Sequence, residues 1–329
     1  MEYTHIPHLE KKVSRIGLGT WAIGGWLWGG TDVPSSIAAI HSAWDRGINL
    51  IDTAPAYGFG RSEEIVGKAL KQYGKRDKVI IATKHGLSWK NEQTVYRDSR
   101  KKTILKEVES SLKRLGVDYI DLYQTHWPDT RTPFAETAET LHELLKQGKI
   151  RAIGVCNFSV EQMQAFQKGG PLHSLQDPFN LFESWIEHNE LAFAMNEKLA
   201  VLGYGSLCRG LLSGKMSKQR VFKGDDLRKS DPKFQEPHFS EYLRCIEQLK
   251  KWVEKKHHRP LLALAVRWSL DKGTNVALWG ARKPDQLNDL DNVWGWKLSA
   301  EDFAEIDQIM KETITHPVEP GNMGPPARE

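Results

Sequence analysis

Short apolar runs alternate with longer amphipathic segments along the chain. There are eight such runs, and most are rich in Val and Ile and apolar on both faces, which is typical of parallel strands covered on both sides. The runs are "RIGLGTW", "INLIDTA", "KVIIATKHG", "YIDLYQTHW", "IRAIGVCNF", "HSLQDPFNLF", "LAVLGYGSL" and "NVALWGA". Between them, helical periodicity is clearest over residues 35–46, 62–73, 101–115, 133–147 and 160–167. Eight strand–helix periods over about 290 residues predict an α/β fold, a (β/α)8 TIM barrel.

Three segments do not follow this alternation of strand and helix patterns. Residues 3–13 predict an N-terminal hairpin, and residues 300–311 predict an extra C-terminal helix before the tail "HPVEPGNMGPPARE". Residues 212–239 follow the seventh strand without clear periodicity, and a connection of this length is more typical of a functional loop than of a simple linker. Because no Gly/Ser-rich linker or change of composition divides the chain, we expect one domain over residues 1–329.

Composition and charge argue against several classes of protein. The 329 residues are 40% hydrophobic and 27% charged, with a net charge of +4 and no concentrated basic stripe, so we expect no nucleic-acid partner. No apolar run approaches the ~20 residues that span a bilayer, and the N-terminus lacks the apolar core of a secretory signal, so we expect no membrane partner. Cys156, Cys208 and Cys245 form no CxxC pair, which favours a reducing cytoplasm. The chain has no HExxH motif, and we expect no metal site. The sequence leaves the oligomeric state open, with a monomer favoured.

Polar side chains stand where three successive apolar runs end. Asp52 follows the second run, Lys84 the third and His126 the fourth, while Tyr57 lies on the loop after Asp52. Taken singly, each has an ordinary reading: a turn cap, a rim lysine, a core histidine and a packing tyrosine. In a barrel, however, the carboxyl ends of the strands face one shared mouth, where active sites lie. Because an unpaired buried charge costs several kcal/mol, on the order of two to five, we expect these groups to pair.

Six segments carry a resemblance to a known family. They are "DTAPAYGFGRSEEIVGKAL", "ATKHG", "QTHWPD", "RAIGVCNFS", "YGSLCRGLLSGK" and "LWGARKPDQL". In this order they resemble the signature segments of the aldo-keto reductases, and of their bacterial general-stress branch in particular, over essentially the whole chain. The resemblance implies a (β/α)8 barrel that binds NADPH and reduces small aldehydes or ketones. It assigns the catalytic roles to Asp52, Tyr57, Lys84 and His126.

The chemistry of these four side chains is consistent with that reaction. Reduction of a carbonyl requires a hydride at carbon and a proton at oxygen, and a tyrosine phenol with a pKa of about 10 is a weak acid at neutral pH. A neighbouring Lys84 ammonium favours the phenolate, so we expect the pKa of Tyr57 to be lowered. Asp52 then holds Lys84 charged and in place. His126 can hydrogen-bond the carbonyl oxygen and fix its direction.

The resemblance also implies a set of cofactor and substrate contacts. Asn157 and Gln176 are expected against the nicotinamide carboxamide, and Tyr204 against the nicotinamide ring. The full set of expected cofactor residues is Thr20, Trp21, Asp52, Asn157, Gln176, Tyr204, Gly205, Ser206, Leu207, Cys208, Arg209, Lys215, Arg228, Gly280, Ala281, Arg282 and Gln286. Trp21, Tyr57 and Trp127 are expected to contact the substrate.

Charge placement predicts where the phosphates of the cofactor lie. Residues 205–210 offer backbone N–H groups and Arg209 to the pyrophosphate, and Lys215 and Arg228 lie on the long loop that can close over it. The segment "GARKPDQ" supplies Arg282, Lys283 and Gln286 for the 2′-phosphate at the expected start of a helix, whose N-terminus favours an anion.

Two positions depart from the family pattern. Cys156 stands where many relatives carry serine, so one hydrogen bond to the carboxamide is in doubt. Leu290 stands where some relatives carry asparagine, so one adenine contact is in doubt.

Three other interpretations agree less well with the sequence. "GLGTWA" at residues 17–22 fits the dinucleotide fingerprint GxGxxA, but that fingerprint must open a helix, and the following "IGGWLWGGTD" predicts none. A barrel lyase would use Lys84 as a Schiff-base nucleophile, which requires a neutral and unpaired amine. A non-catalytic NADP(H)-binding subunit would bind the cofactor without turnover, and the four polar residues at the strand ends argue against it.

Overall fold

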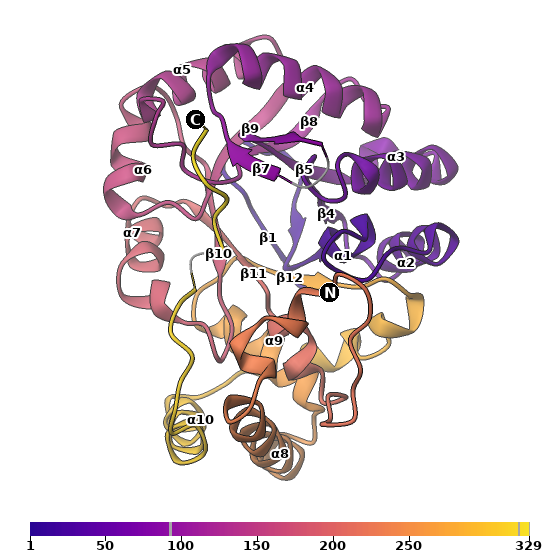
Figure 1. Cartoon of the computed structure of the whole chain (residues 1–329), viewed down its shortest axis with the longest axis vertical. Helices are drawn as coiled ribbons and strands as arrows, with labels where there is room; N and C mark the ends of the chain where they lie inside the picture. Colours follow the sequence, from indigo (N-terminus) through magenta and orange to yellow (C-terminus); the bar gives the residue numbers. More distant parts are fainter. Residues whose placement is uncertain (92–93, 322, 329) are drawn as a thin grey trace.

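Eight parallel strands close into a barrel (Figure 1) in a computed structural model that describes residues 1–91, 94–321 and 323–328. The strands pair in chain order around the barrel, and the last pairs with the first. They are β3 (Ile16–Gly19), β4 (Leu50–Asp52), β5 (Ile80–His85), β8 (Ile120–Thr125), β9 (Ile150–Cys156), β10 (Ser174–Pro178), β11 (Ala200–Tyr204) and β12 (Val276–Gly280). Each lies within one of the eight apolar runs, so the prediction of a (β/α)8 barrel is confirmed.

Helices surround this barrel on its outer side (Figure 1). The α-helices of the described residues are α1 (Trp21–Gly24), α2 (Val33–Asp45), α3 (Arg61–Tyr73), α4 (Lys101–Leu115), α5 (Phe134–Lys146), α6 (Val160–Gln167), α7 (Glu190–Asn196), α8 (His238–His257), α9 (Leu261–Asp271) and α10 (Ala300–Thr313). Short 3-10 helices are η1 (Arg76–Lys78), η2 (Trp185–His188), η3 (Cys208–Ser213), η4 (Leu227–Lys229), η5 (Pro232–Phe234), η6 (Pro284–Leu287) and η7 (Leu290–Val293). None of the helices in the described part is both long enough and apolar enough to cross a bilayer.

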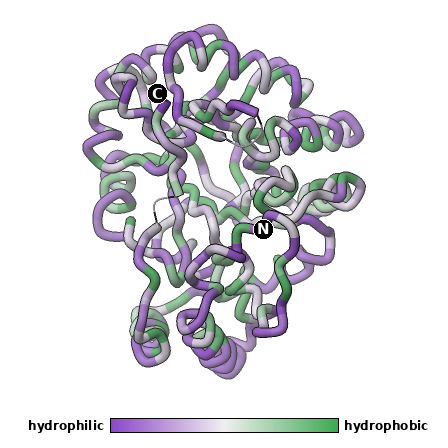
Figure 2. The backbone as a smooth tube through the Cα atoms, in the orientation of Figure 1, coloured by the Kyte–Doolittle hydropathy of each residue, from purple (hydrophilic) through white to green (hydrophobic). Residues whose placement is uncertain are grey.

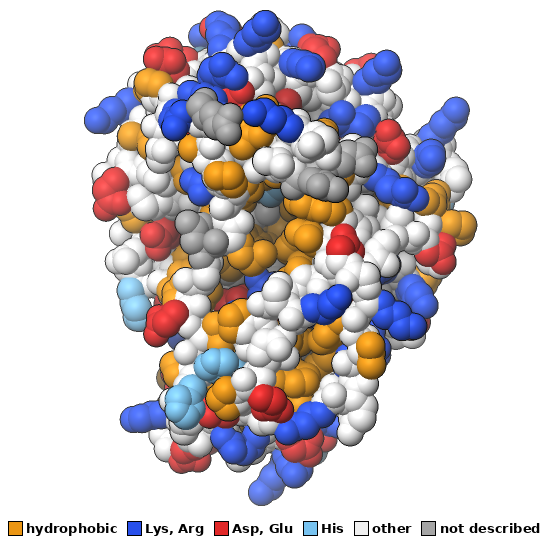
Figure 3. Space-filling model, viewed as in Figure 1, with side chains coloured by type: hydrophobic (Ala, Val, Ile, Leu, Met, Phe, Trp, Pro, Cys, Tyr) orange, Lys and Arg blue, Asp and Glu red, His pale blue; other side chains and the backbone are white. Residues whose placement is uncertain are grey.

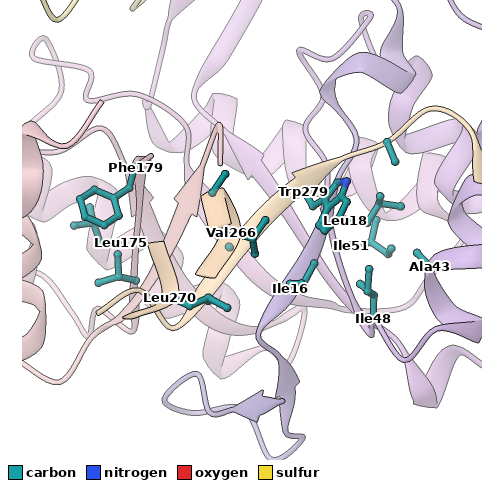
Figure 4. Close-up of a cluster of buried hydrophobic side chains, with 14 of the residues drawn as sticks. Ile16, Leu18, Ala43, Ile48, Ile51, Leu175, Phe179, Val266, Leu270 and Trp279 are labelled. Atoms are coloured by element: carbon teal, nitrogen blue, oxygen red, sulfur yellow. The ribbon is translucent and has the colours of Figure 1, made fainter. Parts of the chain in front are cut away.

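Two layers of apolar side chains hold the strands in place. Side chains that point out of the barrel pack against the helices, among them Ile16, Leu18, Ile51 and Trp279 (Figure 4). Side chains that point inward form a second cluster, which includes Leu50, Ile80, Ala82 and Leu122. Figure 2 shows the same division as hydrophobic stretches on the central strands and hydrophilic stretches on the outer faces of the helices. This alternation follows from the pleat of a strand, which points successive side chains to opposite faces.

The N-terminal hairpin closes one end of the barrel. Strands β1 (Tyr3–Thr4) and β2 (Val13–Ser14) pair in antiparallel fashion, which confirms the hairpin expected over residues 3–13. Ile6 and Val13 from this hairpin belong to the cluster inside the barrel. The hairpin therefore fills the end opposite the carboxyl ends of the strands.

Three features differ from the expectations. A second hairpin, β6 (Leu87–Lys90) and β7 (Thr94–Arg97), follows β5, where the polar sequence gave no clear strand signal. A one-turn helix, α1, forms where no helix was expected, although four residues are far too few for a dinucleotide fold. The segment "GARKPDQ" leads into the four-residue 3-10 helix η6 and not into an α-helix.

The C-terminal segment runs back over the barrel. From the end of α10 it crosses the face of the molecule that carries β7 and reaches the region of α5 (Figure 1). Two positions of the tail, Asn322 and Glu329, lie outside the described residues.

Candidate active site

The pleat of the strands places the expected catalytic side chains inside the barrel. Ile80 and Ala82 of β5 belong to the inner cluster, so Lys84, two residues further, also points inward at the end of that strand. The same alternation carries Asp52 inward after Leu50 of β4. Because both strands end at the same mouth, the two charged groups meet there.

Lys84 is the centre of the resulting cluster. Its Nζ donates hydrogen bonds to Asp52 Oδ1 at 2.6 Å, to the carbonyl oxygen of Thr53 at 3.0 Å and to Tyr57 Oη at 3.1 Å. The side chains of Lys84 and Asp52 are only 1% and 3% exposed. All three donor positions of the ammonium are thus occupied, so the buried charge is compensated.

The second oxygen of Asp52 is held by two glutamines. Gln176 Nε2 donates to Asp52 Oδ2 at 2.8 Å, and Gln124 Nε2 lies 3.4 Å from the same oxygen. Gln124 was not among the expected site residues, although it shares the inward face of β8 with Leu122. Counting alternate residues back from His126 would have found it.

Two glycines allow Tyr57 to reach Lys84. A Cβ atom at position 24 would lie 2.5 Å from the carbonyl oxygen of Tyr57, and one at position 58 would lie 2.2 Å from the carbonyl oxygen of Gly24. Gly58 also has a φ of 68°, which a side chain would disfavour. The loops after β3 and β4 therefore pack backbone against backbone, and this contact fixes the position of the phenol.

Aromatic rings enclose the phenol of Tyr57. The ring of Trp21 stacks on it with centroids 6.2 Å apart, and the ring of His126 meets it edge-on at 5.6 Å. Trp127 packs with Trp26 and other side chains of a small apolar cluster to which the β6–β7 hairpin contributes. Figure 3 shows hydrophobic side chains in the hollowed centre of this face and charged ones around it. The mouth of the barrel is thus apolar around the cluster of polar groups.

Burial decides the pKa of Tyr57. Burial raises the pKa of the phenol to about 12, and the charge of Lys84 offsets only part of this effect. The expected net lowering is therefore wrong, although Lys84 acts in the expected direction. Burial alone would lower the pKa of Lys84, but the Asp52 carboxylate and the Tyr57 hydroxyl outweigh it, so the pKa of the ammonium is raised. Both groups are protonated at neutral pH.

His126 is neutral for the opposite reason. Burial and the nearby Lys84 ammonium together hold the pKa of its imidazole well below the ordinary value. Its backbone fixes it between neighbouring strands, because its N–H donates to the carbonyl oxygen of His85 at 2.9 Å. Its own carbonyl oxygen accepts from Asn157 Nδ2 at 3.0 Å. A neutral imidazole in this position can donate one hydrogen bond to a carbonyl oxygen.

The side chains expected around the nicotinamide lie next to this cluster. Tyr204, on the inward face of β11, donates to Asn157 Oδ1 at 2.9 Å. Gln176 uses its amide nitrogen on Asp52, and no hydrogen bond of the described residues uses its Oε1. Cys156, at the end of β9, is 1% exposed, and burial raises the pKa of its thiol. Asn157, Gln176 and Tyr204 are therefore brought together at one side of the mouth.

Thr20 has a different environment from the one expected. It is fully buried, and its Oγ1 donates to the backbone carbonyl oxygen of Asp52 at 2.8 Å. Ser62 Oγ donates in turn to Thr20 Oγ1 at 2.8 Å. The hydroxyl of Thr20 thus fixes the end of β4, while the neighbouring Trp21 lies against Tyr57.

The loop after β11 offers backbone donors to an anion. Gly205, Cys208 and Arg209 have φ angles of 70°, 43° and 52°. No hydrogen bond of the described residues uses the backbone N–H groups of Ser206 and Leu207. Unpaired N–H groups in such a loop are suited to the oxygens of a phosphate, so this segment fits the diphosphate of a dinucleotide.

Two arginines beside this loop are paired with acids. Arg209 binds Asp231 through a hydrogen-bonded ion pair, and its Nη1 lies 3.9 Å from Glu183 Oε1. The guanidinium of Arg228 binds both oxygens of Asp226, at 2.9 and 2.6 Å. Each therefore brings a positive charge to this side of the mouth, although an acid already neutralises much of it.

Arg282 forms no ion pair with an acid among the described residues, although its charge helps to lower the pKa values of Asp32 and Asp226. Its Nη1 and Nη2 donate to the backbone carbonyl oxygens of Trp28 at 3.0 Å and Gly30 at 2.6 Å. Gln286 Oε1 accepts from the backbone N–H of Arg282 at 2.7 Å. These carbonyls are neutral, so the charge of Arg282 remains available to an anion.

The remaining expected contacts differ in exposure. Gly280, at the end of β12, is exposed, whereas Ala281 is buried. Lys215 is exposed, and its ammonium has no acidic partner in the described part of the chain. Leu290 is fully buried in η7 and contributes to the outer core.

No group of three or more His, Cys, Asp or Glu side chains among residues 1–91, 94–321 and 323–328 is arranged to hold a metal ion.

Known proteins match the chain over most or all of its length. Aldo-keto reductase YhdN of Bacillus subtilis (strain 168) is 57% identical over 330 residues, which cover 100% of this chain and 99% of that protein. The NADH-specific methylglyoxal reductase of Escherichia coli (strain K12) is 36% identical over 294 residues, or 84% of this chain and 88% of that protein.

Solved structures agree with these sequence matches. The glycerol dehydrogenase AKR11B4 from Gluconobacter oxydans superposes with a TM-score of 0.89 at 50% identity, over 98% of this chain and 99% of that one. The holo form of aldo-keto reductase AKR11C1 from Bacillus halodurans gives a TM-score of 0.79 at 26% identity, over 97% and 98%. The sequence model of the Aldo/keto reductase family matches residues 15–311. The chain belongs to the aldo/keto reductase family.

Proposed function

We propose that this protein reduces small aldehydes and ketones to alcohols with NADPH, and that Tyr57 donates the proton. Its family makes it an oxidoreductase that uses a nicotinamide cofactor. One observation carries the proposal further: Lys84 Nζ lies 2.6 Å from Asp52 Oδ1 and 3.1 Å from Tyr57 Oη in a buried site. Such an arrangement serves to stabilise a phenolate that forms during proton transfer.

Each side chain then has one task. A bound nicotinamide in its reduced form supplies the hydride. Tyr57, protonated because its pKa is raised to about 12, donates its proton to the carbonyl oxygen. Lys84 stabilises the phenolate left behind, and Asp52 keeps that ammonium charged and in place. Neutral His126 donates a hydrogen bond to the same carbonyl oxygen and so fixes its direction. The apolar rings around Tyr57 exclude water, which strengthens each of these electrostatic interactions.

The preference for NADPH over NADH rests on charge placement. NADPH carries one additional phosphate, which positive donors can recognise and which NADH lacks. Arg282 supports this preference because only neutral carbonyls hold its guanidinium, whereas Arg228 is neutralised by Asp226. The Escherichia coli relative is an NADH-specific enzyme, so family membership alone leaves the cofactor undecided.

A screen of NADPH oxidation tests the proposal. Methylglyoxal, glyceraldehyde, dihydroxyacetone, aromatic aldehydes and simple ketones would each be offered with NADPH and, separately, with NADH. We expect turnover of several small carbonyls and a higher kcat/KM with NADPH. Absence of turnover with either cofactor would contradict the proposed reaction, and equal rates with both would contradict the cofactor preference.

A barrel lyase that uses Lys84 as a Schiff base is the alternative enzyme class. Such a lysine must be neutral to attack a carbonyl, whereas the pKa of Lys84 is raised and its Nζ has three acceptors. Borohydride treatment in the presence of a carbonyl substrate should therefore leave Lys84 unmodified by mass spectrometry. A reduced adduct on Lys84 would favour the lyase. Tight NADPH binding without turnover of any carbonyl would favour a non-catalytic subunit.

A further inference from the structure

Beyond Ile314, which packs against the hydrophobic core, the C-terminal segment that crosses the barrel mouth is held mainly by polar contacts. We call its described residues, 314–321 and 323–328, the strap. None of these residues is buried, in contrast to the helices that surround the barrel. Because no residue of the strap is fully buried, its position depends largely on a few hydrogen bonds and ion pairs. These contacts lie at its two ends and at its middle.

One end of the strap is attached to α8. Glu241 Oε2 accepts from the backbone N–H groups of Thr315 and His316, both at 2.9 Å. The hydroxyl of Tyr242 accepts from the backbone N–H of Val318 at 3.2 Å. The strap therefore leaves α10 in a fixed direction, toward the mouth (Figure 1).

The middle of the strap lies between the two expected binding regions. Met323 Sδ is 2.7 Å from Nη2 of Arg209, which stands beside the loop suited to the diphosphate. Further on, the carbonyl oxygen of Pro326 accepts from the backbone N–H of Arg97 at 2.9 Å. The guanidinium of Arg97 lies over the ring of Trp127, an expected substrate contact, at 5.6 Å from its centroid. The strap thus spans the mouth from the cofactor side to the substrate side.

The far end of the strap is fastened by Arg328. Its guanidinium forms a hydrogen-bonded ion pair with Asp129, donates to the carbonyl oxygen of Arg131 at 2.7 Å and to Thr132 Oγ1 at 3.2 Å, and lies 3.8 Å from Asp98 Oδ1. The Asp129 and Asp98 side chains are 0% and 3% exposed. Ion pairs with buried carboxylates are stronger than exposed pairs, so Arg328 adds a strong side-chain contact to the backbone bridge between Arg97 and Ala327.

The carboxylates of Asp129 and Asp98 also have hydrogen-bond partners other than Arg328. Asp129 also accepts from the backbone N–H of Ser99 at 2.9 Å, and Asp98 binds the guanidinium of Arg100 at 2.6 Å. When Arg328 leaves, Asp98 keeps its ion pair with Arg100, and Asp129 keeps hydrogen bonds from neutral donors, so the contact can open without leaving either carboxylate without a partner. We call these contacts of Arg328 with Asp129 and Asp98 the latch, because they can open and close.

We propose that Arg328 is a positioning residue that latches the strap across the mouth and thereby limits the size of the carbonyl substrate. This inference rests on the proposed function, because it concerns access to the same site. A latched strap is hydrogen-bonded to Arg97, whose guanidinium lies over the ring of Trp127, and so narrows the substrate side. An unlatched strap leaves that side open to larger carbonyls, while small ones reach Tyr57 in either state.

The test compares Arg328→Ala with a matched control, Arg100→Ala. Arg100 binds the same Asp98, but its side chain is 60% exposed and has no ion pair with the strap. Hydrogen exchange of the strap and of residues 94–97 reports on the latch, and kcat/KM for methylglyoxal and for 2-naphthaldehyde reports on access. Circular dichroism confirms that both variants fold.

We expect Arg328→Ala to accelerate exchange and to raise kcat/KM for 2-naphthaldehyde relative to methylglyoxal by on the order of tenfold, the worth of one lost charge-assisted contact. Arg100→Ala should change neither quantity. Unchanged exchange in Arg328→Ala would overturn the latch, and faster exchange with an unchanged ratio would overturn its role in selectivity. If the wild-type protein reduces neither aldehyde, the proposed function and the selectivity role both fall, and the exchange data alone decide the latch.

Discussion

Replacement of Tyr57 by Phe removes one hydroxyl from the centre of the site. In the structure this hydroxyl accepts one of the three hydrogen bonds of Lys84 Nζ, at 3.1 Å. The other two, to Asp52 and to the carbonyl oxygen of Thr53, remain in the variant. Loss of one such bond lowers the free energy of unfolding by about 0.5–1.5 kcal/mol, so we expect Tyr57→Phe to fold.

We expect Tyr57→Phe to lower kcat strongly, although it lowers the free energy of unfolding only slightly. Without the phenol, no group near the carbonyl oxygen can donate a proton: His126 is neutral because its pKa is lowered, and Lys84 is turned toward Asp52. A positioned general acid contributes roughly 10²–10⁴ to the rate, so kcat should fall by that factor. NADPH affinity should stay within about twofold, because the expected cofactor contacts lie on other side chains.

The assay combines steady-state NADPH oxidation with a fluorescence titration of NADPH. Tyr123→Phe is the matched control, because the Tyr123 hydroxyl is buried without a hydrogen-bond partner in the described structure and points away from the barrel interior. This control should keep wild-type kcat. Near-normal turnover in Tyr57→Phe would refute the assignment of the proton donor, and a large loss of NADPH affinity would show that the phenol acts in binding.

Three further predictions follow from single contacts. Arg282→Ala should weaken NADPH binding about tenfold or more and NADH binding much less, since one charge-assisted contact is lost; the exposed Lys297→Ala is the charge-matched control, and equal weakening of both cofactors would contradict the assignment. Asp52→Asn should lower the free energy of unfolding by about 3–5 kcal/mol, measured by urea denaturation, because it leaves the ammonium of Lys84 buried without its carboxylate. Burial raises the pKa of Glu107 from 4.5 to about 8, so its protonated form is favoured by folding, and stability should fall as pH rises between these values. Glu107→Gln should remove that part of the pH dependence in urea titrations at pH 5 and pH 8.5, and an unchanged slope would contradict the shift.

The sequence alone predicted the barrel because each local signal agreed with the global fold. Eight apolar runs separated by amphipathic segments leave few ways to bury both faces of the strands. The same regularity located Asp52, Lys84 and His126, since polar residues at the ends of successive apolar strands must meet at one mouth. These features depend on spacing along the chain, which the sequence contains directly. The cofactor residues followed from resemblance to a family, and their roles stay predictions.

Tertiary structure alone decided how these groups behave. The direction of the pKa shift of Tyr57 depends on how completely the site is buried, and no local pattern contains that quantity. The partners of Arg282 and Arg328 come from residues more than 190 positions away, so sequence analysis could read them only as loop charges. The contact of Arg97 with Pro325 likewise joins positions 228 residues apart. Side chains that are so far apart in the sequence meet only after the barrel has closed. For this reason, the sequence determined which groups reach the mouth. The tertiary structure determined which partners these groups have and whether they are protonated.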